Sequence, residues 1–317
     1  MLKRTLGKTG IAVSELAFGC VEIGMPYGRA AASLAGMAEE GEAIQLLQTA
    51  LQSGINFFDT ARMYGVSEAV IGKAFKDRRD QAVIATKCRH FLQGNGSLPE
   101  YDELKEIITS SLQESMDALQ TDWIDVFMLH QADERIIKDP AVCAVFAELK
   151  RSGMIRATGV STYTLAQTKL AIAAGAWDVV QVPFNLLDQQ QAALFDQAQA
   201  CGVALVIRSV LLRGLLSTPA VPLHPALETV SQHIERFSTL AGRWQTTLPD
   251  LAIRFALSYP QAAAVLVGID RLNYLHSSLA AADGNYLSAA GRQQAEAMAY
   301  PDPSFIDLPG WDQKGWL

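Results

Sequence analysis

Residues 55–87, INFFDTARMYGVSEAVIGKAFKDRRDQAVIATK, contain two short apolar runs on either side of an amphipathic stretch. The runs, Asn56–Asp59 and Ala82–Lys87, carry apolar residues on both faces, which is typical of strands buried in a parallel sheet. Between them, the apolar residues of Glu68–Phe75 recur with the period of a helix. This stretch therefore predicts a strand, a crossover helix and a second strand parallel to the first.

The same alternation continues through nearly all of the 317 residues. The predicted strands are Leu16–Cys20, Asn56–Asp59, Ala82–Lys87, Ile124–His130, Ala157–Ser161, Val179–Val182, Ala204–Ser209 and Ala263–Gly268. The predicted helices are Glu42–Ser53, Glu68–Phe75, Tyr101–Leu119, Ala141–Arg151, Leu165–Ala174 and Gln189–Cys201. Several of them end at a glycine that suits a left-handed cap, namely Gly54, Gly153, Gly175 and Gly202.

Eight strands, each followed by a helix, favour a closed (β/α)8 TIM barrel of the α/β class over an open, doubly wound sheet. The first strand–helix turn, residues 19–24, lacks the GxGxxG spacing of open dinucleotide-binding sheets. We expect one domain over residues 1–317, with extra helices and a C-terminal loop from Pro301 lying over the barrel.

Composition excludes several classes of function. A formal net charge of −7 gives no basic surface for nucleic acid or for an anionic membrane. No stretch is apolar for long enough to span a membrane, and residues 1–8 are not followed by the apolar run of a signal peptide. Because Cys20, Cys88, Cys143 and Cys201 form no CxxC pair, we expect reduced thiols in a cytoplasmic protein without a metal site.

Three successive predicted strands each end in an ionisable residue. Asp59, Lys87 and His130 each stand at the carboxyl end of a strand. These ends meet at one rim of a parallel barrel, which is where barrel enzymes place their sites. Tyr64 follows Asp59 by five residues in the same predicted loop, close enough to fold back over it. We therefore expect a carboxylate, an ammonium, an imidazole and a phenol at this rim.

Together, these four side chains can transfer a proton to a substrate. A free tyrosine has a pKa of about 10 and donates poorly at neutral pH, and a nearby ammonium lowers that value. Asp59 would keep Lys87 charged, and His130 would hydrogen-bond a substrate oxygen. Taken singly, each residue also has a structural interpretation, as an ion pair, a core histidine or a packed aromatic. Their coincidence at one rim favours catalysis.

Longer segments resemble the aldo-keto reductase family. The likeness lies in residues 56–68 (NFFDTARMYGVSE) and, in order, ATK (85–87), MLH (128–130), GVS (159–161) and VQVPFN (180–185). It extends from Leu6 to about Leu279, and residues 4–14 look like the family's N-terminal β-hairpin. The resemblance implies reversible reduction of aldehydes or ketones by NADP(H), with Tyr64 as proton donor. The implied catalytic residues are Asp59, Tyr64, Lys87 and His130.

The resemblance also implies cofactor contacts on the same rim, and Ser161 and Gln181 resemble the residues that hold the carboxamide. The full set is Cys20, Val21, Asp59, Ser161, Thr162, Gln181, Arg208, Ser209, Leu211, Gly268, Asp270, Tyr274 and Ser278. Three of these residues depart from the family pattern. Thr162 stands where the family usually has Asn, and Arg208 stands where an aromatic residue commonly stacks on the nicotinamide. Tyr274 stands where many members have Arg or Gln.

The cofactor's 2′-phosphate would meet charges of both signs. Asp270 would repel that phosphate, whereas Arg271 would pair with it. We expect NADPH as the preferred cofactor and NADH as the alternative.

The substrate pocket is expected among the loops after the strands and the C-terminal segment. Its candidate residues are Met25, Tyr27, Met63, Phe91, Phe305, Trp311 and Trp316, a lining that favours a small aldehyde or ketone. Two rival functions are a cofactor-bound regulatory subunit of a membrane channel and a Schiff-base aldolase with Lys87 as nucleophile. Pairing with Asp59 argues against the aldolase, and a complete catalytic set argues against the regulatory role.

Overall fold

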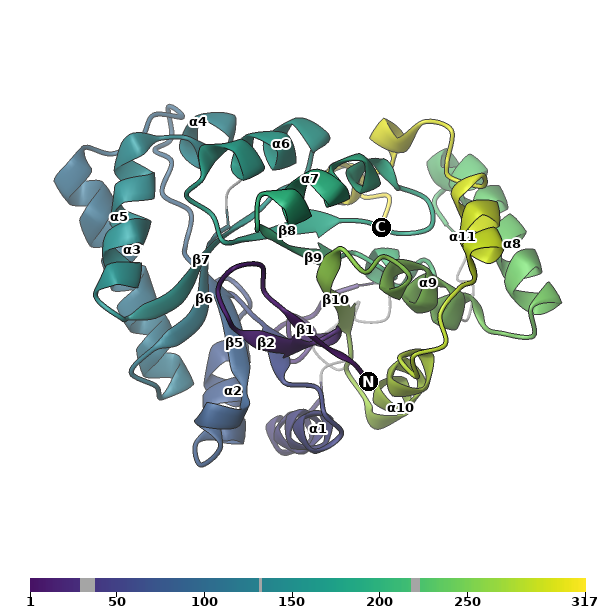
Figure 1. Ribbon diagram of the computed structural model, residues 1–317, viewed down its shortest axis with the longest axis horizontal. Helices are drawn as coiled ribbons and strands as arrows, with labels where there is room; N and C mark the ends of the chain where they lie inside the picture. Colours follow the sequence, from purple (N-terminus) through teal and green to yellow (C-terminus); the bar gives the residue numbers. More distant parts are fainter. Residues whose placement is uncertain (29–37, 131–132, 218–222) are drawn as a thin grey trace.

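Eight parallel strands close into a barrel, in the order β10-β3-β4-β5-β6-β7-β8-β9. The computed structural model describes residues 1–28, 38–130, 133–217 and 223–317 (Figure 1). All eight predicted runs are strands of this barrel, so the predicted (β/α)8 fold is confirmed. The strands are β3 (Leu16–Gly19), β4 (Phe57–Asp59), β5 (Val83–Lys87), β6 (Ile124–Leu129), β7 (Ile155–Ser161), β8 (Val179–Pro183), β9 (Ala204–Arg208) and β10 (Ala262–Gly268).

Helices surround the strands in Figure 1. They are α1 (Glu40–Gln52), α2 (Ser67–Phe75), α3 (Tyr101–Leu119), α4 (Glu134–Ile137), α5 (Pro140–Arg151), α6 (Leu165–Ala174), α7 (Phe195–Ala200), α8 (Glu228–Arg243), α9 (Leu248–Leu257), α10 (Leu272–Ala281), α11 (Ala289–Glu296) and α12 (Leu308–Gln313). The predicted helix Gln189–Cys201 is instead a 3-10 turn, η3 (Gln190–Leu194), followed by the short α7. The Asp188 carboxylate accepts from the Gln190 N–H, which favours a tight turn at this point.

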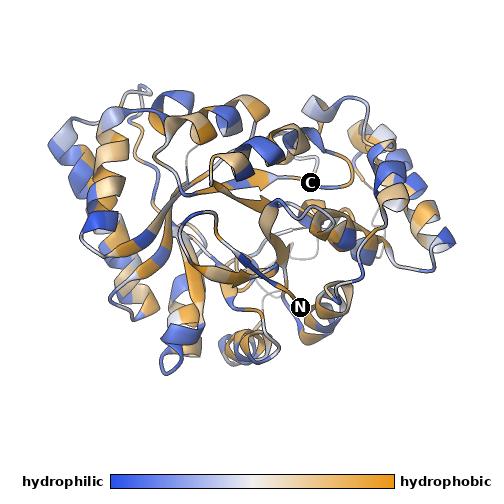
Figure 2. Cartoon of the chain, in the orientation of Figure 1, coloured by the Kyte–Doolittle hydropathy of each residue, from blue (hydrophilic) through white to orange (hydrophobic). Residues whose placement is uncertain are grey.

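Apolar side chains fill both faces of the strands. Along β3, Ala17 belongs to the cluster inside the barrel, whereas Leu16 and Phe18 belong to the cluster between strands and helices. In Figure 2 the strands are mostly hydrophobic, whereas the helices carry both hydrophobic and hydrophilic residues. Burial on both faces explains why the strand sequences are continuously apolar rather than alternating.

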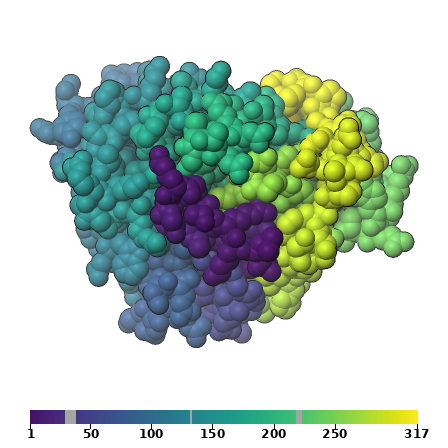
Figure 3. Space-filling view, in the orientation of Figure 1, coloured from purple at the N-terminus to yellow at the C-terminus, as the bar shows by residue number. Residues whose placement is uncertain are grey.

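An antiparallel hairpin of β1 (Lys3–Thr5) and β2 (Ala12–Ser14) lies across the amino-terminal end of the barrel. In Figure 3 it forms the purple band across the middle of the visible face. Leu6, Ile11 and Val13 of this segment belong to the cluster inside the barrel. The N-terminal hairpin that the resemblance implied is thus present, and it covers the barrel end opposite the ionisable strand ends.

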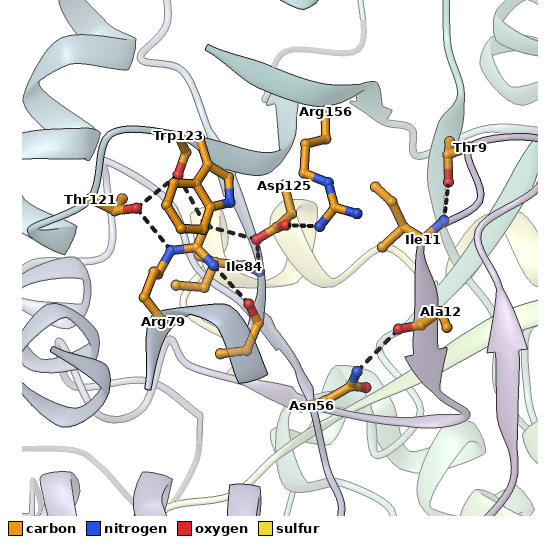
Figure 4. Close-up of polar contacts among 11 residues, drawn as sticks. Thr9, Ile11, Ala12, Asn56, Arg79, Ile84, Thr121, Trp123, Asp125 and Arg156 are labelled. Atoms are coloured by element: carbon orange, nitrogen blue, oxygen red, sulfur yellow. Dashed lines mark hydrogen bonds and ion pairs between the residues drawn. The ribbon is translucent and has the colours of Figure 1, made fainter. Parts of the chain in front are cut away.

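A buried carboxylate braces three neighbouring strands near the same end (Figure 4). Asp125, on β6, lies 2.8 Å from a guanidinium nitrogen of Arg79 and 2.6 Å from one of Arg156, on β7. It also accepts a hydrogen bond of 3.0 Å from the backbone N–H of Ile84, on β5. This carboxylate, which is 1% exposed, thus accepts three hydrogen bonds, two of them from guanidinium groups that compensate its buried charge.

The C-terminal segment is more regular than the sequence predicts. Beyond Pro301 the chain forms a 3-10 turn, η6 (Pro303–Phe305), and helix α12 rather than only a loop. The Asp307 side chain accepts from the N–H of Gly310 and so caps α12. Trp311 is 1% exposed and anchors this helix in the core.

Two further features bear on function. All four cysteines are unpaired. Among the described residues, no helix is long and apolar enough to cross a membrane, and no group of three His, Cys, Asp or Glu side chains is arranged to hold a metal ion.

Candidate active site

A buried ion pair lies at the carboxyl ends of β4 and β5. The Nζ of Lys87 is 2.7 Å from Asp59 Oδ2 and donates a second hydrogen bond, of 2.9 Å, to the carbonyl oxygen of Thr60. The other oxygen of Asp59 accepts from the side-chain amide of Gln181, on β8, at 2.8 Å. Because the Lys87 side chain is fully buried, its charge requires these partners.

Tyr64 and His130 lie beside this pair. The Lys87 ammonium is 4.9 Å from the centroid of the Tyr64 ring. The Tyr64 and His130 rings meet edge to face, with centroids 5.8 Å apart. The structure therefore brings together the four side chains that the sequence placed at one rim.

The loop after β4 is folded tightly, and this fixes Tyr64. The Tyr64 N–H donates to the carbonyl oxygen of Ala61 at 3.0 Å. Gly65 follows with φ of 55°, and a Cβ there would collide with the carbonyl oxygen of Gly24. Only glycine permits this close approach of the loops after β3 and β4.

Burial dominates the acid–base properties of both rings. It raises the pKa of Tyr64 above the usual range of a phenol, the Asp59 charge adds to the rise, and Arg208 opposes it. The sequence predicts a pKa lowered by Lys87, but that ammonium already donates to Asp59, so its effect on the phenol is offset. Burial also lowers the pKa of His130 to about 3, and the Lys87 charge adds to the decrease.

A cavity of about 910 Å³ opens at this rim, near the upper end of the range for small-molecule sites. Asp59, Tyr64 and His130 line it, whereas Lys87 does not. Buried polar atoms of the same lining residues have no hydrogen-bond partner among the described residues: Glu22 Oε2, His130 Nδ1 and Arg213 Nε. Such atoms indicate a polar ligand that completes their hydrogen bonds, and a dinucleotide fits this size and character.

All but one of the predicted cofactor contacts line this cavity: Cys20, Val21, Asp59, Ser161, Gln181, Arg208, Ser209, Leu211, Gly268, Asp270, Tyr274 and Ser278. Thr162 does not, because its hydroxyl is buried at 2.8 Å from that of Thr168. Its carbonyl oxygen instead accepts from the Arg208 guanidinium, at 2.8 Å, and the guanidinium carbon lies 4.5 Å from the centroid of the Tyr163 ring. Thr162 and Tyr163 therefore hold the Arg208 plane in the cavity.

The two charges expected near a 2′-phosphate are paired with each other. Arg271 makes two hydrogen bonds to Asp270, of 3.1 Å and 2.9 Å. The Arg271 guanidinium carbon also lies 5.1 Å from the centroid of the Tyr274 ring. Asp270 and Tyr274 line the cavity, whereas Arg271 lies outside the lining.

The predicted substrate residues divide into two groups. Met25 and Tyr27 line the cavity. Met63 is half exposed, Phe91 and Trp311 are buried in the core, and Phe305 packs against both Trp311 and Trp316, so the structure does not bring these five to the cavity. The C-terminal segment contributes other residues of α12 instead: Leu308, Pro309 and Asp312.

The polar lining residues that sequence reasoning missed include Glu22, Tyr163 and Arg213. Each lies in a loop after a barrel strand, within four residues of a position already proposed. A search of every polar residue in these loops would have found them, because all such loops meet at one rim.

Comparison with known proteins assigns the chain to a family. The sequence model of the aldo/keto reductase family matches residues 16–294. The chain belongs to the aldo/keto reductase family. It is 28% identical to the NADH-specific methylglyoxal reductase of Escherichia coli strain K12, over 94% of this chain and 99% of that protein. It is 27% identical to the L-galactose dehydrogenase of Arabidopsis thaliana, over 88% of this chain and 87% of that protein.

A solved structure agrees in fold. The holo form of the aldo-keto reductase AKR11C1 from Bacillus halodurans superposes with a TM-score of 0.78 and 28% sequence identity, covering 95% of this chain and 97% of that one. This aldo-keto reductase is therefore an NAD(P)H-dependent oxidoreductase that acts on carbonyl groups. The family resemblance drawn from the sequence motifs is confirmed.

Proposed function

We propose that this aldo-keto reductase reduces small aldehydes and ketones and that Tyr64 protonates the carbonyl oxygen. One observation carries the proposal: Tyr64 and His130 face one cavity while the Lys87–Asp59 pair is buried beside the phenol. A proton donor, a second hydrogen-bond donor and a fixed positive charge are thus available at one point.

The residues present fit a nicotinamide cofactor. Ser161 and Gln181 would hold its carboxamide, and Gln181 is already oriented by its hydrogen bond to Asp59. When bound, the cofactor supplies a hydride to the carbonyl carbon. We expect NADPH to bind more tightly than NADH, because the half-exposed Arg271 side chain can exchange its ion pair with Asp270 for one with a 2′-phosphate.

The chain's own residues then manage the proton and the charge. As hydride reaches the carbon, the carbonyl π bond breaks and the oxygen takes the proton of the Tyr64 hydroxyl. The raised pKa keeps Tyr64 protonated at neutral pH, and the alkoxide that forms is a stronger base than a phenolate. Lys87 stabilises the resulting phenolate until solvent returns a proton, and neutral His130 donates a hydrogen bond to the substrate oxygen.

The remaining features concern substrate and compartment. Met25, Tyr27 and Leu308 favour a small carbonyl compound over a heavily charged one.

Lys87 lies outside the cavity lining and donates to two oxygens, which disfavours a Schiff-base aldolase. The four unpaired cysteines support our expectation of a reducing compartment, the cytoplasm.

The test is a panel of aldehydes and ketones with NADPH and with NADH, monitored by loss of reduced-cofactor absorbance. We expect Tyr64→Phe to lower kcat by about 100-fold or more, with cofactor Kd changed less than about twofold. Tyr101→Phe, at the exposed start of α3, is the matched control and should change neither value.

Three outcomes would count against these assignments. A Tyr64→Phe variant within about threefold of the wild-type kcat would remove Tyr64 as proton donor. Tighter binding of NADH than of NADPH would reverse the cofactor preference. Tight cofactor binding without turnover of any carbonyl would favour a regulatory role instead.

A further inference from the structure

Glu22 is a carboxyl group in the cavity that the mechanism does not use. It lies in the turn after β3, and its Oε1 occupies the space beside the Cα of Gly268, at the end of β10. Any side chain at position 268 would collide with this carboxyl group. The other oxygen, Oε2, is buried without a hydrogen-bond partner among the described residues.

Glu22 lies between the two ends of the cavity. On one side, the turn that carries Glu22 packs against the loop that carries Tyr64, because a Cβ on Gly24 would meet the Tyr64 carbonyl oxygen. On the other side it lies close to Asp270, at the end where Tyr274 and Ser278 also line the cavity. A dinucleotide with its nicotinamide at Tyr64 and its adenosine at α10 must therefore pass its diphosphate beside Glu22.

Nearby cations do not neutralise Glu22. Arg213, from the loop after β9, faces Glu22. However, its guanidinium group is already paired with the Asp312 carboxylate at 3.3 Å, and its guanidinium carbon lies 4.5 Å from the centroid of the Tyr27 ring. Arg271 is paired with Asp270. An ionised Glu22 would thus place a weakly compensated negative charge next to a diphosphate.

The ionisation of Glu22 falls within the physiological range. Burial raises the pKa of Glu22 to about 7, Asp270 adds to the rise, and Arg213 opposes it. The thiol of Cys20, in the same turn, remains protonated because burial and the charges of Asp59 and Glu22 raise its pKa. Glu22 is therefore the group facing this part of the cavity that changes charge near neutral pH.

We propose that Glu22 is a cofactor-affinity residue whose protonated carboxyl group donates a hydrogen bond to the diphosphate and whose ionised form repels it. This inference rests on the proposed function, since it requires a dinucleotide in the cavity. Binding would then take up a proton, and affinity would fall as pH rises above the pKa of the free enzyme's Glu22.

The test compares wild type with Glu22→Gln, which keeps the shape and a donor but removes the titration. With NADH as probe, chosen because it lacks a titrating 2′-phosphate, we expect the wild-type Kd to rise about tenfold or more between about pH 6 and about pH 9. The Glu22→Gln Kd should stay within about twofold over the same range. Glu103→Gln, an exposed change on α3, is the matched control and should behave as wild type.

Proton uptake gives a second readout. Titration calorimetry with NADH at about pH 7.5, in two buffers of different ionisation enthalpy, should show uptake by wild type and none by Glu22→Gln. A wild-type Kd that does not depend on pH, or the same dependence in Glu22→Gln, would overturn the inference. So would an equal loss of affinity in Glu22→Gln at every pH, which would mean that Glu22 accepts from a ribose hydroxyl. Absence of binding by any variant would instead contradict the proposed function.

Discussion

The charge on His130 decides how this residue can act on a substrate oxygen. Burial and the Lys87 charge lower its pKa to about 3, so the imidazole is neutral at physiological pH. A neutral ring donates an N–H without adding a second positive charge beside Lys87. We expect kcat, measured with saturating cofactor and substrate, to show no inflection near about pH 6.5, where an exposed histidine titrates.

The pH profile of kcat checks this expectation. An inflection near that pH in wild type, absent from His130→Gln, would show that His130 titrates during turnover. His276→Gln is the control, because this histidine is exposed on α10. Glu22 should not enter the profile, since its proposed effect is on cofactor affinity and saturation removes it.

Sequence reasoning found the residues whose place follows from the end of a strand. Asp59, Lys87 and His130 could be placed at one rim because parallel strands all end on the same side. Glu22 could not be found in this way, because a residue in an irregular turn has no periodic signal and its contact with Gly268, distant in sequence, forms only in the folded chain. The direction of the Tyr64 pKa shift was also out of reach, since it depends on how deeply the loop buries the phenol.

Among the elements, the loop after β9 holds the most unusual backbone of the rim. Ser209, Leu212 and Arg213 have φ values of 59°, 47° and 53°, in the left-handed region that disfavours residues with a Cβ. All three residues line the cavity. Backbone strain of this kind persists where the surroundings hold it for a functional geometry, here the position of the Arg208 and Arg213 side chains.

The network around Asp125 gives a prediction for the elements at the other end of the barrel. Asp125→Ala removes two ion pairs and the acceptor of the Ile84 N–H, and it leaves Arg79, whose side chain is 10% exposed, with only backbone and hydroxyl partners. We expect the free energy of unfolding to fall by about 3 kcal/mol. Urea denaturation measures it.

The matched control is Asp77→Ala, an exposed aspartate in the turn after α2. It should change the free energy of unfolding by less than about 0.5 kcal/mol. An Asp125→Ala variant as stable as this control would mean that the network contributes nothing to stability. The cofactor Kd should be the same in both variants, because Asp125 does not line the cavity.

The elements predicted best were those with the longest regular signal. Strands buried on both faces produce continuous apolar runs, and all eight were found. The C-terminal helix α12 was missed because its six residues are too few for a helical period, and it depends on the Asp307 cap and on the burial of Trp311. The pocket aromatics were misplaced for the same reason, since tail packing is a tertiary property.

At the scale of the whole molecule, the two halves of the chain are joined by barrel closure. β10 pairs with β3, so the last strand completes the sheet begun by the first. The hairpin adds a second link, because the Arg4 guanidinium donates to the carbonyl oxygens of Leu257, Tyr259 and Ala262. It also pairs with the buried carboxylate of Glu15, at 2.9 Å. We therefore propose that residues 1–317 unfold as one unit.

Replacing Arg4 tests that proposal, because its contacts bridge the first strand and the end of α9. Arg4→Ala should lower the free energy of unfolding by about 2 kcal/mol. Urea unfolding is followed by far-UV circular dichroism and by tryptophan fluorescence, which reports on buried Trp177 and Trp311. The two transitions should shift together. Lys3→Ala, exposed on the same strand, should leave both unchanged. Two separate transitions in wild type, or an Arg4→Ala shift confined to one probe, would mean that the halves unfold independently and that barrel closure does not couple them.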